Sequence, residues 1–352
     1  MSTITAPQHT TGAEPSGPTL PEQASILLGS VAGYMASRII DMGQRAGLVA
    51  ALADQPGATT LDLAETLELD EFFVSVWCRG ALGAGVLDRH GEGFTLAPHM
   101  ATLLLDAGSP AYVGGMFPLV GRSELFGRFD ENLSTGARMW WDDTSPEWIA
   151  AVAGTGRPFY TRLAPAGLDQ VPGLAERLAS GGTIVDHACG AGVGVVRLAN
   201  AYPQAHIVGV DGDAHSIKQA RARVAEAGLS DRVELIHSPL EEMTLPEPAT
   251  LVVNNISMHE CRDIDQVTQK VLAALEPGGW FVISDFPFPE TDEALRTLPG
   301  RIMSGIQFFE AQIDDQLLPR SAYDELLQRH GFTELGSTSL TPVHALTWGR
   351  RH

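Results

Sequence analysis

The sequence has few cysteines and no long apolar run. Its three cysteines (Cys78, Cys189 and Cys261) are too few and too widely spaced for a disulfide framework, so we expect a reducing, cytoplasmic location. No apolar stretch approaches the roughly 20 residues that cross a bilayer, so no membrane segment is expected. Residues 1–23 lack the basic start and apolar stretch of a signal peptide and predict a flexible tail.

Basic residues are also scarce. Lysine and arginine together number 23, against 43 aspartates and glutamates, which gives a formal net charge of −20. A surface of this sign repels nucleic acids and anionic membranes, so neither is expected as a partner. Hydrophobic residues make up 44% of the 352-residue chain, enough to bury a sizeable core over two or three domains. These totals favour a globular protein with a small-molecule substrate.

Residues 24–105 predict a winged-helix-like domain. Apolar positions over 24–53 recur at three- and four-residue steps, which is typical of a helix. Thr60 or Asp62 is suited to cap a short second helix, and Asp70 to cap a third. Residues 85–99 then predict two short strands around a glycine-rich turn. Helices followed by such a hairpin form the winged-helix pattern.

Residues 181–352 alternate between strand-like and helix-like segments, and residues 106–180 predict a helical linker or substrate lid. The alternation indicates an α/β fold, with a Rossmann-like doubly wound sheet in the C-terminal half. The final two strand-like runs are close in sequence and predict an antiparallel hairpin. The strand-like runs are 183–188, 206–211, 233–238, 250–257, 280–286, 332–340 and 343–351.

A glycine-rich turn follows the first of these strands. Gly190, Gly192 and Gly194 permit positive φ angles and close approach of a ligand, and the next helix offers free N–H groups to an anion. Asp211 ends the second strand, where an acid accepts hydrogen bonds from a ribose diol. Asp186 precedes the glycines, which favours a single nucleoside with an ammonium group over a dinucleotide. The alternative is a turn that only permits close helix–sheet packing.

These motifs carry a resemblance to a known family. Residues 182–285 resemble the class I S-adenosylmethionine-dependent methyltransferase domain. With residues 24–105 added, the chain is similar to small-molecule O-methyltransferases whose N-terminal winged-helix domain serves dimerisation. The resemblance implies S-adenosylmethionine as cofactor and a homodimer. The cofactor site that it implies consists of Asp186, Ala188, Gly190, Gly192, Asp211, Gly212, Ser238, Leu240 and Asn254.

The sequence departs from the family pattern at two places in this set. Ala188 stands where the family usually has the first glycine of the turn. Ser238 and Pro239 stand where the family often has Gly-Asp, whose acid lies near the adenine amino group.

The fourth strand ends in Met258-His259-Glu260, which matches the family's Leu-His-Asp. In the family this histidine removes the proton of the substrate hydroxyl, and imidazole, with a pKa of about 6.5, accepts protons near neutral pH. Asp285 and Glu310 are candidates to orient His259. A histidine that only caps its strand by a hydrogen bond is the alternative interpretation.

No metal is expected. His259, Cys261, Asp263 and Asp265 lie close in sequence, but their spacing fits no zinc pattern. His344 is expected to be a structural histidine.

The predicted function is methylation of a hydroxyl on a small, aromatic or polyketide-like metabolite. Residues 300–318 and Trp140, Trp141 and Phe159 supply apolar side chains for a pocket, or for the core. Methyl transfer to carbon, nitrogen or sulfur remains open, as does a changed chemistry on the same fold. A winged-helix regulator is disfavoured, because residues 70–80 carry a single basic residue.

Overall fold

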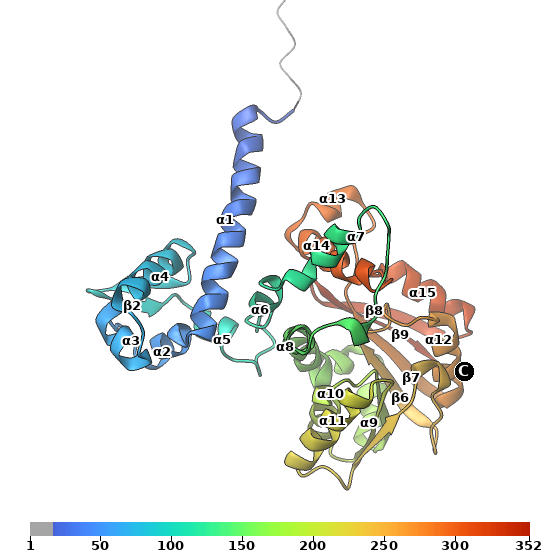
Figure 1. Ribbon diagram of the computed structural model, residues 1–352. Helices are drawn as coiled ribbons and strands as arrows, with labels where there is room; N and C mark the ends of the chain where they lie inside the picture. Colours follow the sequence, from blue (N-terminus) through green and yellow to red (C-terminus); the bar gives the residue numbers. More distant parts are fainter. Residues whose placement is uncertain (1–16) are drawn as a thin grey trace, which may run out of the picture.

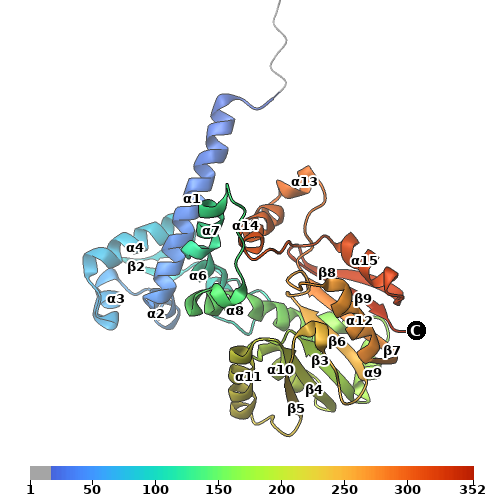
Figure 2. The same cartoon turned by 45° about the vertical axis from the view of Figure 1, so that its right-hand side comes forward.

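The computed structural model describes residues 17–352, and the chain forms an N-terminal helical part and a C-terminal α/β part (Figure 1). The N-terminal half of helix α1 (Leu20–Arg45) projects away from the rest of the described chain in both views (Figures 1 and 2). It begins earlier than the expected end of the tail at residue 23. The backbone N–H of Thr19 donates to Glu22 Oε2 at 2.6 Å and Pro21 occupies the first turn, so this segment is held as a helix start. The rest of the expected tail, residues 1–16, lies outside the described residues.

The N-terminal part contains the expected order of helices and hairpin. The expected long helix divides at Gly47, which has a φ of +78°, into α1 and α2. Thr59, rather than Thr60 or Asp62, is the N-cap of α3, with Asp62 closing the capping box from the third position. Asp70 caps α4 as expected. The elements are α2 (Leu48–Asp54), α3 (Thr60–Leu67), α4 (Glu71–Gly83), β1 (Leu87–His90), β2 (Gly93–Leu96) and α5 (Met100–Leu104).

Short helices connect the two parts. The longest of them, α8 (Pro146–Arg162), begins at the N-cap Ser145 and packs against the first helix of the α/β part. The other α-helices of this segment are α6 (Met116–Val120), which packs on α8, α7 (Gly127–Asn132) and α9 (Leu174–Ala179). Among residues 17–352, no helix has both the length and the apolarity needed to cross a bilayer.

The C-terminal part is built on a seven-stranded sheet with the strand order β5-β4-β3-β6-β7-β9-β8. The first five strands are parallel, and β9 pairs antiparallel with both β7 and β8, which confirms the terminal hairpin. The strands are β3 (Gly182–His187), β4 (Ala205–Asp211), β5 (Val233–His237), β6 (Ala249–Asn255), β7 (Leu275–Asp285), β8 (Thr333–Thr341) and β9 (His344–Arg350). This is the doubly wound sheet that the sequence predicts.

Alternation along each strand produces two cores, one on each face of the sheet. Ile184 faces one core and its neighbour Val185 faces the other. Helices from opposite sides cover these faces (Figure 1). One face is covered by α9, α10 (Val193–Ala201) and α11 (Ala214–Glu226), and the other by α12 (Ile264–Ala274) and α15 (Arg320–Arg329).

The order in which strands are added to the sheet reverses at β3, which pairs with β4 on one side and β6 on the other. In open α/β sheets, ligands bind outside the carboxyl ends of the strands at such a point. Here those ends carry Asp211 on β4 and Asp285 on β7. The sheet therefore places the candidate residues of the sequence along one edge.

Candidate active site

The turn after β3 has a left-handed backbone. Its φ angles are +67° at Ala188, +51° at Gly190 and +81° at Gly192. The N–H groups of Ala188 and Cys189 both donate to Val210 O, at 2.9 and 3.0 Å, which fixes the turn on the end of β4. Because positive φ is costly for a residue with a Cβ, this conformation explains why the family prefers glycine at position 188.

The three glycines of the turn serve different purposes. A Cβ on Gly192 would lie 2.9 Å from Ala220 Cα of α11, and one on Gly194 would overlap Tyr160 and Asp186. Glycine at these two positions is therefore required by packing, as the alternative interpretation holds. A Cβ on Gly190 would meet nothing within 4 Å, so the turn is open at this residue.

Asp211 is held directly against this open residue. One carboxylate oxygen accepts from the Gly190 N–H at 2.8 Å and the other from the Asp213 N–H at 2.9 Å. Burial raises the pKa of Asp211, although the two backbone hydrogen bonds act in the opposite direction. Each oxygen has a second lone pair, so the carboxylate can still accept hydrogen bonds from a diol.

Asp186 is fully buried, and only one of its two carboxylate oxygens has a hydrogen-bond partner among the described residues. Its Oδ1 accepts from the Tyr160 hydroxyl of α8 at 2.9 Å, whereas its Oδ2 has no partner within the described chain. Burial raises the pKa of Asp186 to about 7, against the opposing hydrogen bond from Tyr160. An orphaned buried carboxylate oxygen fits a cationic ligand group such as an ammonium. Sequence reasoning missed Tyr160, because no local pattern indicates that α8 packs beside β3.

The other implied cofactor residues surround the ends of β4, β5 and β6. Gly212 O contacts His237 Nε2 at 3.0 Å, and the Ser238 hydroxyl donates to Pro239 O at 3.0 Å. Leu240 opens a short 3-10 turn, Leu240–Glu242. The Asn254 side chain is buried, with its Nδ2 3.3 Å from His187 Nδ1. Asn254 is therefore engaged inside the sheet.

His259 lies in a buried group of acids just beyond β6. Its Nδ1 is 2.8 Å from Asp285 Oδ2. Asp285 also accepts from the Tyr323 hydroxyl at 2.6 Å and from the Phe286 N–H at 2.8 Å. Glu310 of α14 (Leu298–Gln312) lies on the other side of the ring, with its Oε2 3.8 Å from His259 Nε2. The structure thus brings together His259, Asp285 and Glu310, the three candidate residues of the sequence analysis, and adds Tyr323.

The acids dominate the electrostatics of this group. Burial would lower the pKa of His259, but Asp285, Glu310 and Glu260 outweigh it and raise this pKa to about 10. Burial raises the pKa of Glu310 to about 7, and His259 opposes that shift. Burial likewise raises the pKa of nearby Asp315 to about 7. The group therefore binds protons strongly at neutral pH.

His344 is structural, as expected. Arg162 Nε donates to its Nδ1 at 3.1 Å, and its Nε2 is 2.7 Å from the Ser284 hydroxyl, which in turn donates to Asn255 Oδ1. Burial lowers the pKa of His344 to about 3, so the ring is neutral. The chain of hydrogen bonds joins α8 to the ends of β6 and β7.

The apolar residues proposed for a pocket divide between surface and core. Phe309 of α14 packs on fully buried Trp148 at a ring separation of 4.2 Å, so this part of 300–318 belongs to the core. Phe159 contacts Phe286, which follows Asp285, at 5.0 Å. Trp140 lies under the guanidinium of Arg262, 3.4 Å from Cζ to the ring centre. Of these aromatic residues, Phe286 lies beside His259, with ring centres 6.4 Å apart, and buried Phe159 packs on Phe286 and His344.

Comparison with known proteins extends these observations. Residues 178–328 match the protein family described as "Methyltransferase domain". A stretch of 123 residues is 31% identical to trans-aconitate 2-methyltransferase of Azoarcus sp. (strain BH72), covering 35% of this chain and 44% of that protein. A stretch of 115 residues is 28% identical to the U6 snRNA (guanine-N(2))-methyltransferase THUMPD2 of Bos taurus, covering 31% and 23%. The chain spans less than half the length of these relatives.

Solved structures match nearly the whole chain. Human N-acetylserotonin methyltransferase in complex with SAM is 16% identical with a TM-score of 0.69, covering 96% of this chain and 99% of that one. Mitomycin 7-O-methyltransferase MmcR is 18% identical with a TM-score of 0.68, covering 93% and 98%. The N,N-8-amino-8-demethyl-D-riboflavin dimethyltransferase RosA of Streptomyces davawensis is 22% identical with a TM-score of 0.65, covering 95% and 100%. At these identities the likeness concerns the fold.

The sheet order, the open glycine turn and the acid that ends β4 define a class I methyltransferase fold. Residues 178–328 match the methyltransferase domain family, and one of the solved structures that share the fold is a complex with SAM, S-adenosylmethionine. Three features fit this cofactor: the orphaned Asp186 oxygen, the open space at Gly190 and the carboxylate of Asp211.

Proposed function

We propose that this protein transfers the methyl group of S-adenosylmethionine to a hydroxyl of a small aromatic or polyketide-like metabolite, with His259 as general base. The observation that carries the proposal is the buried His259–Asp285 pair, 2.8 Å apart, at the same sheet edge as the Gly190–Asp211 contact. A base beside a nucleoside site is what methyl transfer to a hydroxyl needs, because a neutral hydroxyl is a poor nucleophile.

Each nitrogen of His259 has a separate task in this proposal. Asp285 accepts the Nδ1 proton, which fixes the tautomer and leaves Nε2 free to take the hydroxyl proton. Tyr323 and the Phe286 N–H hold Asp285 in place from the other side. Once His259 carries the proton, Asp285 and Glu310 stabilise the imidazolium.

The cofactor residues hold the donor in line. When bound, S-adenosylmethionine supplies an electrophilic methyl group on its sulfonium. We assign binding of the ribose to Asp211 and binding of the amino-acid ammonium to Asp186. The cofactor would lie on the open side of the turn at Gly190. Tyr160 orients Asp186 through its 2.9 Å hydrogen bond. Holding oxygen and methyl in line supplies much of the rate enhancement.

The choice of a small, apolar substrate rests on charge and on neighbouring side chains. Phe286 meets the His259 ring edge to face, and Phe159 packs edge to face on Phe286. The net charge of −20 opposes binding of nucleic acid. Support also comes from the shared fold of mitomycin 7-O-methyltransferase, whose name states methylation of an oxygen.

We further propose that the protein is a homodimer formed through its N-terminal part. Helix α1 exposes an apolar face toward solvent, formed by Ile26, Leu27, Leu28, Val31, Tyr34 and Met35. Exposed apolar patches of this kind mark interaction sites.

The proposal is tested by binding and turnover. We expect calorimetry to detect S-adenosylmethionine binding to the wild type and its loss in Asp211→Ala. His259→Ala should keep this binding but lose methyl transfer to a panel of phenols by about 10²–10⁴-fold. His206→Ala, an exposed histidine on β4, is the matched control and should retain full turnover. A wild type that binds no cofactor would refute the function, and full activity in His259→Ala would refute the base.

A further inference from the structure

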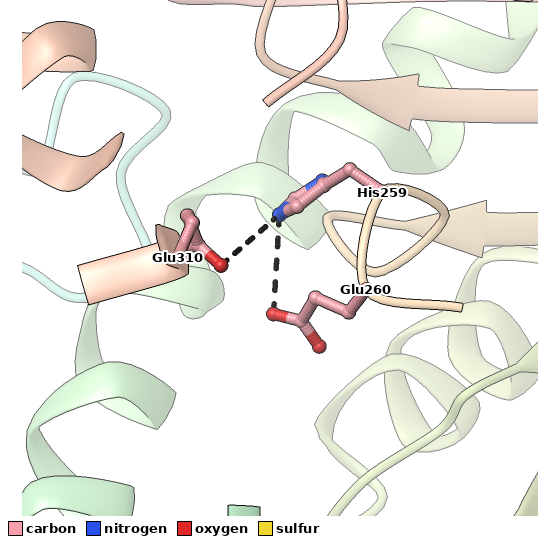
Figure 3. A group of neighbouring side chains, drawn as sticks. All are labelled: His259, Glu260 and Glu310. Carbon is pink, nitrogen blue, oxygen red and sulfur yellow. Dashed lines mark ion pairs between the residues drawn. The ribbon is translucent and has the colours of Figure 1, made fainter. Parts of the chain in front are cut away.

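Three donor atoms around His259 converge on one point. His259 Nε2 lies 3.9 Å from Glu260 Oε1 and 3.8 Å from Glu310 Oε2, and all three atoms are within 4.8 Å of one another. Figure 3 shows both glutamates turned toward the ring, Glu310 from α14 and Glu260 from the loop after β6. These three residues differ from the group that lies close in the sequence, which is His259, Cys261, Asp263 and Asp265. Asp263 caps α12, and Asp265 pairs with Arg329.

One of these atoms lacks a partner. Glu310 is 6% exposed, and its Oε2 makes no hydrogen bond to any described residue. The Oδ2 of Asp315, also buried, is likewise unpartnered. A buried carboxylate oxygen without a partner costs free energy unless a proton or a cation meets it. Glu310 Oε2 is therefore a possible metal-ligand atom that makes no hydrogen bond to a described residue and faces His259 Nε2 at 3.8 Å.

His259 is prepared as a metal ligand by the residue behind it. In protein metal sites, a ligating histidine almost always gives its other ring N–H to a carboxylate or carbonyl. Here Nδ1 lies 2.8 Å from Asp285 Oδ2, and Asp285 is itself held by Tyr323 and Phe286. This arrangement directs Nε2 at the two glutamates, and an ion that binds there displaces the Nε2 proton.

We propose that His259 Nε2, Glu260 and Glu310 bind one divalent transition-metal ion of the zinc class. One imidazole and two carboxylates form a donor set typical of zinc, with an open fourth position. Tetrahedral zinc ligands at 2.0–2.2 Å from the ion lie about 3.3–3.6 Å apart. The gaps of 3.8 and 3.9 Å exceed this by only about half an ångström. Rotation of the flexible glutamates closes such a gap.

The ion and the substrate proton compete for the same lone pair. This inference rests on the proposed function, in which Nε2 is the proton acceptor. With the ion bound, His259 accepts no proton, so zinc inhibits methyl transfer and a chelator restores it. Binding also releases protons from the group, because ligands bind metal in their deprotonated forms.

The test is titration of the full chain with zinc chloride by calorimetry, in the absence of substrate. We expect one site per chain in the wild type, and at least about tenfold weaker binding in Glu310→Gln and Glu260→Gln. Magnesium chloride should bind far more weakly, because imidazole is a poor ligand for magnesium. Glu293→Gln, on exposed α13 (Asp292–Leu295), is the matched control for charge and should bind zinc like the wild type.

Cys261→Ser controls for adventitious zinc binding to the neighbouring thiol and should also keep its affinity. Because Glu310 is buried, the zinc affinity of Glu310→Gln is compared only if this variant has the same melting temperature as the wild type. Glu260 is partly exposed, so Glu260→Gln tests the site independently of that condition. Wild-type protein that binds no zinc, or variants that bind it unchanged, would overturn the site. If the wild type transfers methyl groups but binds no zinc, only the metal site is refuted. Zinc binding without binding of S-adenosylmethionine refutes the proposed function alone.

Discussion

At the scale of single residues, Ala188 is a strained substitute for glycine. Its φ of +67° costs an L-residue roughly 1–2 kcal/mol, and both flanking hydrogen bonds to Val210 O depend on this conformation. Ala188→Gly removes the strain but makes the unfolded chain more flexible, which costs about 0.4–1 kcal/mol. We therefore expect a net gain of about 0.5–1 kcal/mol in the free energy of unfolding, measured by urea denaturation.

The control for this substitution is Ala222→Gly on the exposed side of α11. A glycine inside a helix should lower the free energy of unfolding by about 0.5–1 kcal/mol. If both variants were destabilised alike, backbone strain at position 188 would be ruled out.

A second residue-scale prediction concerns the pH dependence of turnover. The pKa of His259 is raised to about 10, and a general base must be neutral, so turnover should rise as pH increases toward that value. Glu310→Gln removes one of the negative charges that favour the imidazolium, so it lowers the pKa of His259. The groups that continue to face His259 are Asp285 with Tyr323, Glu260 and Asp315.

We expect the acid limb of the kcat–pH profile of Glu310→Gln to move to lower pH by roughly one unit. Glu293→Gln, at an exposed position of α13, should leave the profile in place. A shift toward higher pH in Glu310→Gln would contradict the electrostatic role given to this acid.

At the scale of elements, α8 joins the connecting segment to the methyltransferase domain. Tyr160 donates to buried Asp186, and Arg162 reaches His344 on β9. Tyr160→Phe would leave Asp186 without a hydrogen-bond partner and raise its pKa further, because the Tyr160 hydrogen bond lowers it. The loss of a buried hydrogen bond to a charged group costs about 1–3 kcal/mol.

We expect Tyr160→Phe to lower the free energy of unfolding by this amount and to weaken S-adenosylmethionine binding in calorimetry. Tyr202→Phe, which removes a hydroxyl that bonds to no described residue, is the matched control and should change neither quantity by as much. Unchanged cofactor affinity in Tyr160→Phe would show that α8 supports the fold without positioning Asp186.

At the scale of the whole molecule, the apolar face of α1 is the feature that the single chain leaves unexplained. Leu27 is 70% exposed, and Val31 and Met35 follow it at four-residue steps on the same side of the helix. We expect a second copy of the chain to cover this face, because the N-terminal half of α1 projects from the molecule and leaves the face exposed (Figure 2).

The double variant Leu27→Glu/Met35→Glu should therefore convert a dimer to a monomer, as measured by light scattering after size-exclusion chromatography. Ser25→Glu adds charge to an exposed position on the opposite side of the same helix and should leave the dimer intact. A wild type that is monomeric at all accessible concentrations would refute the dimer.

Much of the fold could be read from local pattern. Alternation of apolar residues identifies β3 to β7 and the β8–β9 hairpin, because each strand must face two cores at once. Capping residues locate helix starts. Asp70 is the N-cap of α4 as expected, whereas the N-cap of α3 is Thr59, one residue before the expected Thr60, because Thr59 forms the capping box with Asp62. The start of α1 was missed because the Thr19–Glu22 contact lies in a segment that otherwise looks like a tail.

The chain order alone fixes that Gly190, Asp211 and His259 follow strand ends, since that depends only on local pattern. It does not fix which distant groups meet there. Tyr160, Asp285, Glu310 and Tyr323 reach the site from separate helices and strands, so packing of these elements sets their distances and the protonation of His259. The physical reason is that pKa values and ligand geometry depend on burial and on contacts between residues far apart in sequence.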